Sequence, residues 1–173
     1  MDHFSKVLPN LLKIPFFSDF SIDDEEDVNI LKMFYENCKV QKFKKGDIII
    51  KEGEHGDLCY ILYKGSIHIT RSTPAGDELA IADLDESQHV FFGETAIVSN
   101  EARSATVSAL TEEVTVIAIT AKDFKKMSNE VPLLGYRVLF FLAKSMAQTI
   151  HQLNKDKTIL YEALFNEIEG SND

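Results

Sequence analysis

The sequence predicts a mainly β protein with flanking helices, and its hydrophobic periodicity carries this prediction. Residues 40–120 hold short β-branched or aromatic runs, separated by glycine and proline turn signals about every ten residues. Before and after this block, apolar residues follow the three-four spacing of helices. The central runs are DIII, LCYILY, SIHIT, ELAIADL, SATVSAL and VTVIAI. Such closely spaced strands are typical of a compact antiparallel sandwich or barrel.

Composition limits the classes of partner. A chain of 173 residues that is 45% hydrophobic is long enough for one domain with a substantial core. Its formal net charge of −10 repels nucleic acids and anionic lipid surfaces, so we expect neither as a partner. The start of the chain lacks a secretory pattern, and no stretch reaches the roughly 18 continuous apolar residues of a membrane span. These features predict a cytoplasmic protein.

Residues 1–39 are predicted to form a helical lead-in. One face of a first helix is apolar, and Pro9 makes this helix short or kinked. Its apolar residues are Phe4, Val7, Leu8, Leu11 and Leu12. Ser21 can then cap a second helix, whose first turn is rich in carboxylates that suit a positive helix N-terminus. These carboxylates are Asp23, Asp24, Glu25 and Glu26.

Residues 122–173 are predicted to be helical again. Thr120 can cap a short helix, and Pro132 suits the first turn of a long one that extends to about Ile168. A heptad seam runs along the long helix, with Lys157 as its polar interruption. The seam consists of Met146, Ile150, Leu153, Lys157, Leu160 and Leu164. About 35 residues of helix span about 50 Å, so the simplest partner for the seam is a second copy of the chain.

A loop in the central block combines residues that suit an anionic ligand. Gly93 lets the backbone approach a ligand closely, and the segment ETAIV can form one helical turn whose N–H groups face an anion. Arg103 opens the following strand and can reach back over the loop to bind phosphate oxygens. Glu94 is then free to accept hydrogen bonds from a diol. The alternative is that Arg103 pairs with Glu101 or Glu112 on the surface.

The segment FGETAIVSNEARSATVSA resembles the phosphate-binding cassette of cyclic nucleotide-binding domains. This family includes the bacterial cAMP receptor protein, the regulatory subunits of cAMP-dependent protein kinase and cyclic nucleotide-gated channels. The segments KKGDIIIKEGEHGDLCYILYKGSIHI and IPFFSDFS are also similar to the family. The resemblance implies an antiparallel β roll of about eight strands, a jelly-roll-like double-stranded β-helix, over residues 40–121.

The resemblance also implies roles for residues of the cassette. Glu94 would hold the ribose 2′-hydroxyl, and Arg103 would hold the cyclic phosphate. The residues implied to offer backbone groups around the sugar-phosphate are Gly93, Thr95 and Ala96.

Four further positions concern the phosphate and the base. Ser104 matches a serine that helps to hold phosphate in the bacterial receptor, and a residue of this type is also associated with reading guanine. Ile69 and Ile81, expected to point inward by strand alternation, match apolar positions of the base pocket, although either could be plain core. Thr149 matches a residue that reads the adenine amino group, which would favour cAMP; alternatively it is an ordinary helical threonine.

Enzymatic classes find no support in the sequence. The five histidines show no H-x-H or HExxH spacing, and no G-x-S-x-G elbow is present, so we expect no enzyme, metal or cofactor. Cys38 and Cys59 are too few and too isolated for a disulfide framework or a zinc site, and are expected to be reduced thiols in the core. The chain also stops where bacterial relatives continue into a helix-turn-helix, so we expect no DNA partner.

The sequence therefore predicts a stand-alone cyclic nucleotide sensor, with cAMP as ligand in preference to cGMP. The ligand would be anchored by Arg103 and Glu94 and would shift a hinge around residues 127–135, so that the C-terminal helix docks as a lid. We expect a homodimer through this helix and an effector protein as the receiver of the signal. The alternative is a ligand-free β-roll scaffold that dimerises and binds a protein partner.

Overall fold

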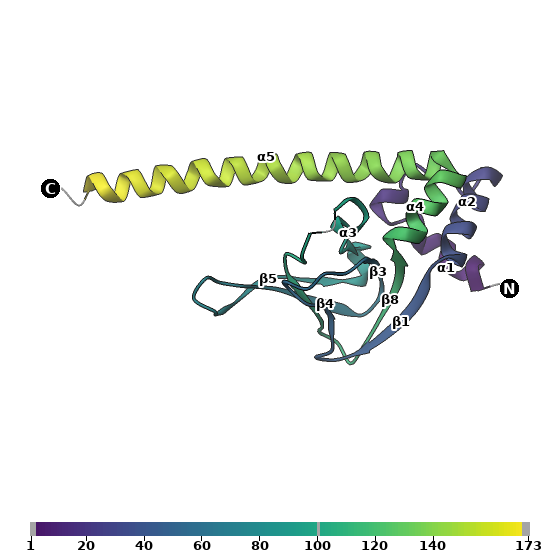
Figure 1. Ribbon diagram of the computed structural model, residues 1–173, viewed down its shortest axis with the longest axis horizontal. Coiled ribbons are helices and arrows are strands. Elements are labelled where there is room, and N and C mark those ends of the chain that lie inside the picture. The colour runs from purple at the N-terminus through teal and green to yellow at the C-terminus, as the bar shows by residue number, and fades with distance from the viewer. Residues whose placement is uncertain (1–2, 100, 171–173) are drawn as a thin grey trace. The chain divides into compact units, whose positions relative to one another are not determined.

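The computed structural model describes residues 3–99 and 101–170, and eight strands form two antiparallel sheets of four (Figure 1). The first sheet has the order β1-β8-β3-β6 and the second the order β2-β7-β4-β5. The strands are β1 (Lys39–Lys44), β2 (Ile48–Ile50), β3 (Leu58–Lys64), β4 (Ser66–Ser72), β5 (Glu78–Asp85), β6 (Phe91–Phe92), β7 (Thr106–Ala109) and β8 (Glu113–Thr120). The predicted mainly β fold with flanking helices is confirmed.

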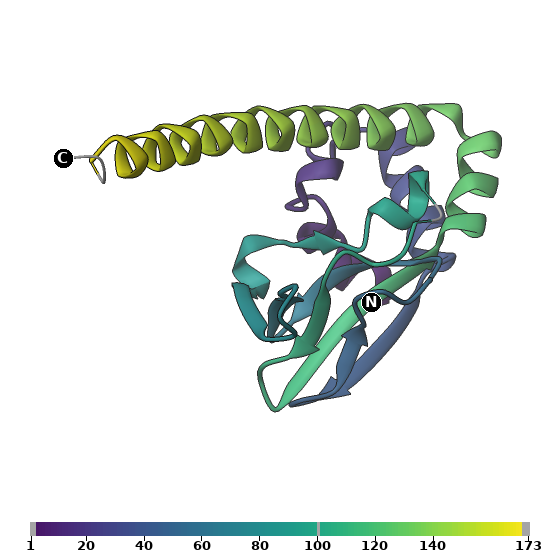
Figure 2. The ribbon, with the colours of Figure 1, turned by 60° about the vertical axis from the view of Figure 1, so that its left-hand side comes forward.

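Strands from opposite ends of the block pair with one another, which gives the roll its topology. β1 pairs with β8 along its whole length, and β2 pairs with β7. β8 also pairs with β3, and β4 lies between β5 and β7. The chain thus winds back across both sheets as a jelly-roll-like β roll, seen from a second side in Figure 2.

The core of the roll is filled by β-branched and aromatic side chains. Tyr60 of β3 stacks on Phe92 of β6, with ring centroids 5.2 Å apart. Alternation along β7 buries Val107 and Ala109 while leaving their neighbours half-buried, as expected for a strand with one face on the core. The fully buried or nearly buried members of the cluster are Ile49, Ile50, Tyr60, Leu62, Ile67, Phe92, Val107, Ala109, Val114, Val116 and Ala118.

The helices before the roll form an aromatic cluster. They are α1 (His3–Leu11), η1 (Pro15–Phe17) and α2 (Glu25–Glu36). Phe17 is fully buried and meets Phe34 edge to face at 4.9 Å. α1 is short and contains Pro9, as the sequence predicts.

The predicted cap of α2 is wrong. Asp24, rather than Ser21, is the N-cap, because its carboxylate accepts hydrogen bonds from the backbone N–H groups of Glu26 and Asp27 at 2.8 and 3.3 Å. The Ser21 hydroxyl instead accepts from the Asp23 N–H at 3.2 Å, within the turn that precedes the helix. Carboxylates still occupy the first turn, where they face the positive end of the helix.

Two helices follow the roll, α4 (Ala121–Glu130) and α5 (Pro132–Gly170), and two shorter ones interrupt it, η2 (Glu86–Gln88) and α3 (Thr95–Val98). Thr120 caps α4 by accepting from the Asp123 N–H at 3.0 Å, and Pro132 begins α5, both as predicted. The chain divides into two compact units, Met1–Arg137 and Val138–Asp173. The division by role into residues 1–39, 40–121 and 122–173 stays a prediction.

The described residues of the C-terminal unit, 138–170, all belong to α5, which has 39 residues in all. The apolar seam residues are exposed, from 46% at Leu164 to 61% at Leu153. No helix in the described part of the chain is long and apolar enough to cross a membrane.

Candidate functional site

The loop after β6 turns sharply at Gly93 and leads into α3. Gly93 has φ of 71°, a conformation that residues with a side chain rarely adopt. Glu94 is the N-cap residue of α3, and its carbonyl accepts from the Ile97 N–H at 3.0 Å. The Ala96 N–H donates to the Gly93 carbonyl at 3.2 Å. The predicted single helical turn over ETAIV is therefore present.

Arg103 is the most buried charged side chain of this loop, with 8% of its surface exposed. Its guanidinium donates through Nη1 to the Gly93 carbonyl at 3.1 Å and through Nη2 to the Leu58 carbonyl at 2.6 Å. The backbone N–H of Arg103 donates to the Glu54 carbonyl at 2.9 Å. Pairing with a surface carboxylate, the alternative interpretation of this arginine, is not what the structure has.

Two glycines leave room for the guanidinium. A Cβ at Gly56 would lie 3.0 Å from Arg103 Nη2, and a Cβ at Gly93 would lie 3.1 Å from Arg103 Nη1. Because both contacts would be tighter than ordinary van der Waals packing, any larger residue would displace the arginine. Glycines of two separate loops therefore leave the space that the Arg103 side chain occupies.

The charge of Arg103 has no carboxylate partner within 4.0 Å among residues 3–99 and 101–170. An arginine stays protonated in proteins, so its burial is costly unless an anion or several acceptors compensate it. Two carbonyls supply part of this compensation, and the remaining donors can serve a bound anion.

Electrostatic effects of the loop reach Cys59 on β3. Burial raises the pKa of the Cys59 thiol to about 12, and the nearby Arg103 charge opposes part of that rise. Cys59 is fully buried, whereas Cys38 is partly exposed, and both are free thiols. A thiol with such a pKa is protonated near neutral pH and is a poor nucleophile.

A hollow opens beside Arg103 and gathers most of the residues predicted for the site. Glu94, Thr95 and Ser104 line it together with Arg103, so an acidic residue, two hydroxyl-bearing residues and a basic residue surround the same space. The complete lining is Ile50, Ile69, Phe92, Gly93, Glu94, Thr95, Arg103, Ser104, Ala105 and Val107. Ala96 directly follows Thr95 in the first turn of α3.

Three predicted site residues lie outside this lining: Ala96, Ile81 and Thr149. Ile81 is 51% exposed, and it lies at a shift of the β4–β5 register, where Ile69 is paired with Ala82 and Thr70 with Ala80. The strand alternation that was expected to point it inward is interrupted there. Thr149 donates its hydroxyl to the Ser145 carbonyl at 3.1 Å within α5, and its role toward a base stays a prediction.

Several residues that position Arg103 could not be identified from the sequence. Leu58 supplies a backbone carbonyl, and Gly56 supplies empty space, neither of which leaves a side-chain signal. The glycine-rich segment KEGEHGDL was recognised as a turn, but nothing in it indicates which later residue it contacts. The prediction that Arg103 opens a strand is wrong as well: β7 begins at Thr106, since the Arg103 backbone pairs with the turn at Gly53 and Glu54.

Metal chemistry finds no ligand set here. Within the described ranges, no three His, Cys, Asp or Glu side chains come together in a way that could hold a metal ion. The site is therefore built from a guanidinium, a carboxylate, hydroxyls and an apolar wall, which suits an anionic ligand that also carries hydroxyl groups.

Residues 40–130 match the cyclic nucleotide-binding domain family, and the chain belongs to this family. Human cGMP-dependent protein kinase 2 is 36% identical over 89 residues, which are 51% of this chain and 11% of the kinase. The chain spans only about a tenth of the length of the curated kinases that it matches. The domain is a regulatory fold.

Solved structures agree with this fold. The N-terminal domain of a transcriptional regulator from Streptomyces coelicolor is 25% identical, with a TM-score of 0.69 over 83% of this chain and 94% of that chain. The regulatory domain of Toxoplasma gondii PKA, solved with cAMP, is 22% identical, with a TM-score of 0.67 over 84% of this chain and 50% of that chain.

Proposed function

We propose that this chain is a regulatory sensor that binds a cyclic nucleotide beside Arg103, takes cAMP in preference to cGMP, and has no catalytic activity of its own. The observation that carries the proposal is the buried Arg103 charge, which lacks a carboxylate partner among the described residues and borders the hollow. A cyclic phosphate would supply the missing anion.

The sugar would lie against Glu94. An ionised carboxylate only accepts hydrogen bonds, so it suits the ribose 2′-hydroxyl, while the hydroxyls of Thr95 and Ser104 can donate to phosphate oxygens. The apolar side of the hollow, formed by Ile50, Ile69 and Val107, would support the base and sugar.

The choice of base rests on Thr149. Ser104 suits either nucleotide, and the relatives include both cGMP-dependent kinases and a regulatory domain solved with cAMP. The sequence match of Thr149 to an adenine-reading residue favours cAMP.

The signal would pass through the elbow between α4 and α5. The cassette helix α3 contacts α4. At the elbow, Gly135 packs so closely on α4 that a Cβ there would lie 2.7 Å from the Ser128 Cβ. A shift of α3 on ligand binding would therefore be felt by residues 127–135 and by the helix that follows, provided that the ligand binds one arrangement more tightly.

Calorimetric titration of the purified chain with cAMP and with cGMP tests the proposal. We expect cAMP to bind more tightly, and Arg103→Ala to weaken binding by about 2–4 kcal/mol through loss of a charge-assisted pair. Arg71→Ala is the matched control, because Arg71 is an exposed arginine outside the hollow. Thermal melting of each variant checks that it is folded.

Each part of the proposal has a result that would refute it. Binding that survives in Arg103→Ala would refute the phosphate contact, and tighter binding of cGMP would refute the choice of base. Silence with both nucleotides would refute the sensor and leave the ligand-free dimerisation scaffold.

A further inference from the structure

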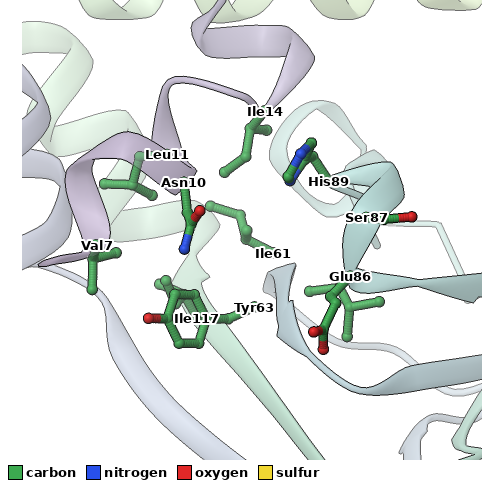
Figure 3. Close-up of a pocket in the computed structure, with 11 residues that line it drawn as sticks. Val7, Asn10, Leu11, Ile14, Ile61, Tyr63, Glu86, Ser87, His89 and Ile117 are labelled. Atoms are coloured by element: carbon green, nitrogen blue, oxygen red, sulfur yellow. The ribbon is translucent and has the colours of Figure 1, made fainter. Parts of the chain in front are cut away.

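A second hollow lies between the N-terminal helix and the first sheet of the roll (Figure 3). It has a volume of about 260 Å³ and shares no lining residue with the hollow beside Arg103. Its lining comes from α1 and the turn after it, from β3 and β8, and from the segment around η2. The residues are Val7, Asn10, Leu11, Ile14, Ile61, Leu62, Tyr63, Glu86, Ser87, His89 and Ile117.

The floor of this second hollow is apolar. Leu11, Ile14 and Ile61 are each at most 3% exposed, and in Figure 3 Ile61 extends toward the middle of the space. An apolar cavity of roughly 150 Å³ suffices to hold benzene. A hollow of about 260 Å³ can therefore accept a molecule of one or two aromatic rings.

The rim offers hydrogen-bonding groups that the protein itself does not use. The side chains of Asn10, Tyr63 and His89 make no hydrogen bond to any residue that the structure describes. In Figure 3 the Asn10 amide lies above Tyr63 and across the space from His89. An apolar floor with a few converging polar groups is the usual form of a small-molecule site.

The charge of the rim selects the class of ligand. Glu86 is the only acidic residue of the lining, which contains no lysine or arginine. One oxygen of its carboxylate accepts from the Gly65 N–H, and the other remains available. An anion such as a second cyclic nucleotide would meet a carboxylate and no cation, so a cationic or neutral molecule is favoured.

The backbone beside the hollow is held in an unusual conformation. His89 has φ of 50°, the one positive value among the non-glycine residues that the structure describes. Residues held in such sparsely populated conformations concentrate at ligand-binding sites. Four residues later the same segment reaches Gly93, so a ligand at His89 would touch the chain that leads into the cassette.

We propose that this second hollow binds a small arylalkylamine, that is, a molecule of one or two aromatic rings with an amine on a short alkyl chain. The rings would lie on Leu11, Ile14 and Ile61, and the ammonium group would pair with Glu86. This proposal does not depend on whether a cyclic nucleotide binds beside Arg103.

Three probes with the same ring system and different charge test the proposal: tryptamine, indole and indole-3-acetate. The full chain is titrated with each while amide NMR shifts are recorded. We expect saturable binding in the order tryptamine, indole, indole-3-acetate, with the largest shifts at Asn10, Tyr63, Ser87 and His89. Saturation with indole-3-acetate at lower concentration than tryptamine would overturn the assignment of charge.

Two variants and a control separate the site from non-specific binding. Asn10→Trp fills the hollow from an exposed position of α1 and should abolish saturable tryptamine binding, whereas Ser5→Trp, exposed on another face of α1, should leave it intact. Glu86→Gln should weaken tryptamine about threefold to fivefold and leave indole unchanged, since the charge at the rim is partly screened by solvent.

The amide NMR spectrum of each variant, recorded before any ligand is added, shows whether that variant is folded. Tryptamine binding that persists in Asn10→Trp, or no saturable binding of any probe to the unmodified chain, would overturn the proposal.

Discussion

At the scale of single residues, Arg103 and Glu94 divide the proposed work of the site. The arginine is fixed by two backbone carbonyls and by the space that two glycines leave. A side chain held in this way loses little further conformational entropy when an anion binds, which increases affinity. Glu94 lines the same hollow and presents acceptors only.

Glu94 should recognise the 2′-hydroxyl of the ligand. We expect Glu94→Ala to weaken cAMP binding by about 1.5–3 kcal/mol, the range for a hydrogen bond to a charged group. The same variant should bind 2′-deoxy-cAMP as well as the unmodified protein does, since the contact is already absent. Calorimetry of both proteins with both nucleotides measures these four affinities. An equal loss of binding free energy for cAMP and for 2′-deoxy-cAMP would contradict the assignment. Glu101→Ala, an exposed carboxylate of the same loop, is the control.

The Cys59 thiol should make stability depend on pH in the alkaline range. Burial raises its folded-state pKa from 9.0 to about 12, so the unfolded chain loses this proton first. The contribution of the protonated Cys59 thiol to the free energy of unfolding is therefore present below about pH 9, and it is lost as the pH rises from there toward 12. We expect the Cys59 contribution to the free energy of unfolding to fall by about 1 kcal/mol between roughly pH 8.5 and pH 10.

Urea unfolding at these two pH values measures the effect. Cys59→Ala should lose less stability over this interval than the unmodified protein. Val116→Ala, a core variant that keeps the thiol, should lose as much as the unmodified protein. An equal loss in Cys59→Ala would show that other groups are responsible.

At the scale of elements, an ion pair joins α2 to the start of α5. Arg137 Nη1 donates to Asp27 Oδ1 at 2.6 Å, and Asp27 Oδ2 accepts from the Ser21 N–H at 2.9 Å. The guanidinium also lies 4.4 Å from the centre of the Phe20 ring. Asp27 is nearly fully buried, so removing one partner leaves a poorly solvated charge on the other.

Asp27→Asn should lower the free energy of unfolding by about 3 kcal/mol, because Arg137 keeps its charge and loses its partner. The double variant Asp27→Asn/Arg137→Met should recover part of this loss, which denaturant unfolding can measure. Glu130→Gln breaks an exposed pair with Lys126 and should cost less than about 1 kcal/mol. Strictly additive effects of the two substitutions would argue against coupling between Asp27 and Arg137.

Elements were predictable wherever a local pattern specifies them. The short β-branched runs of the strands and the cap-forming Thr120 were both predicted correctly from neighbouring residues. The cap of α2 was not, because Ser21 and Asp24 both have side chains that can cap a helix and only the folded turn selects between them. The bulge that displaces Ile81 depends on pairing with β4, which its own strand does not encode.

At the scale of the whole molecule, the heptad seam of α5 is the feature that calls for a partner. Its apolar residues are about half exposed, and exposed apolar area of this kind marks an interaction surface. A heptad repeat is satisfied by a second helix with the same repeat, and Lys157 would be its one polar position. We therefore expect a homodimer that forms through this helix.

Replacing Leu153 and Leu160 by Glu should convert this dimer to a monomer, because four carboxylates would be brought into one seam. Analytical ultracentrifugation measures the change in mass. Ile159→Glu removes an exposed apolar side chain beside the seam and should leave the dimer intact. A dimer that persists in the Leu153→Glu/Leu160→Glu protein would locate the interface elsewhere.

The sequence by itself determined the features that depend on neighbouring residues: the closely spaced β-branched strands, the heptad of the last helix, and the cassette with its single helical turn. Only the tertiary structure decided the contacts between distant residues. Arg103 is held by a carbonyl 45 positions away, and Arg137 pairs with a carboxylate 110 positions away. The hollow under α1 likewise joins segments from four parts of the chain. Periodicity records which face of an element is buried, whereas the partner on that face depends on the path of the folded chain.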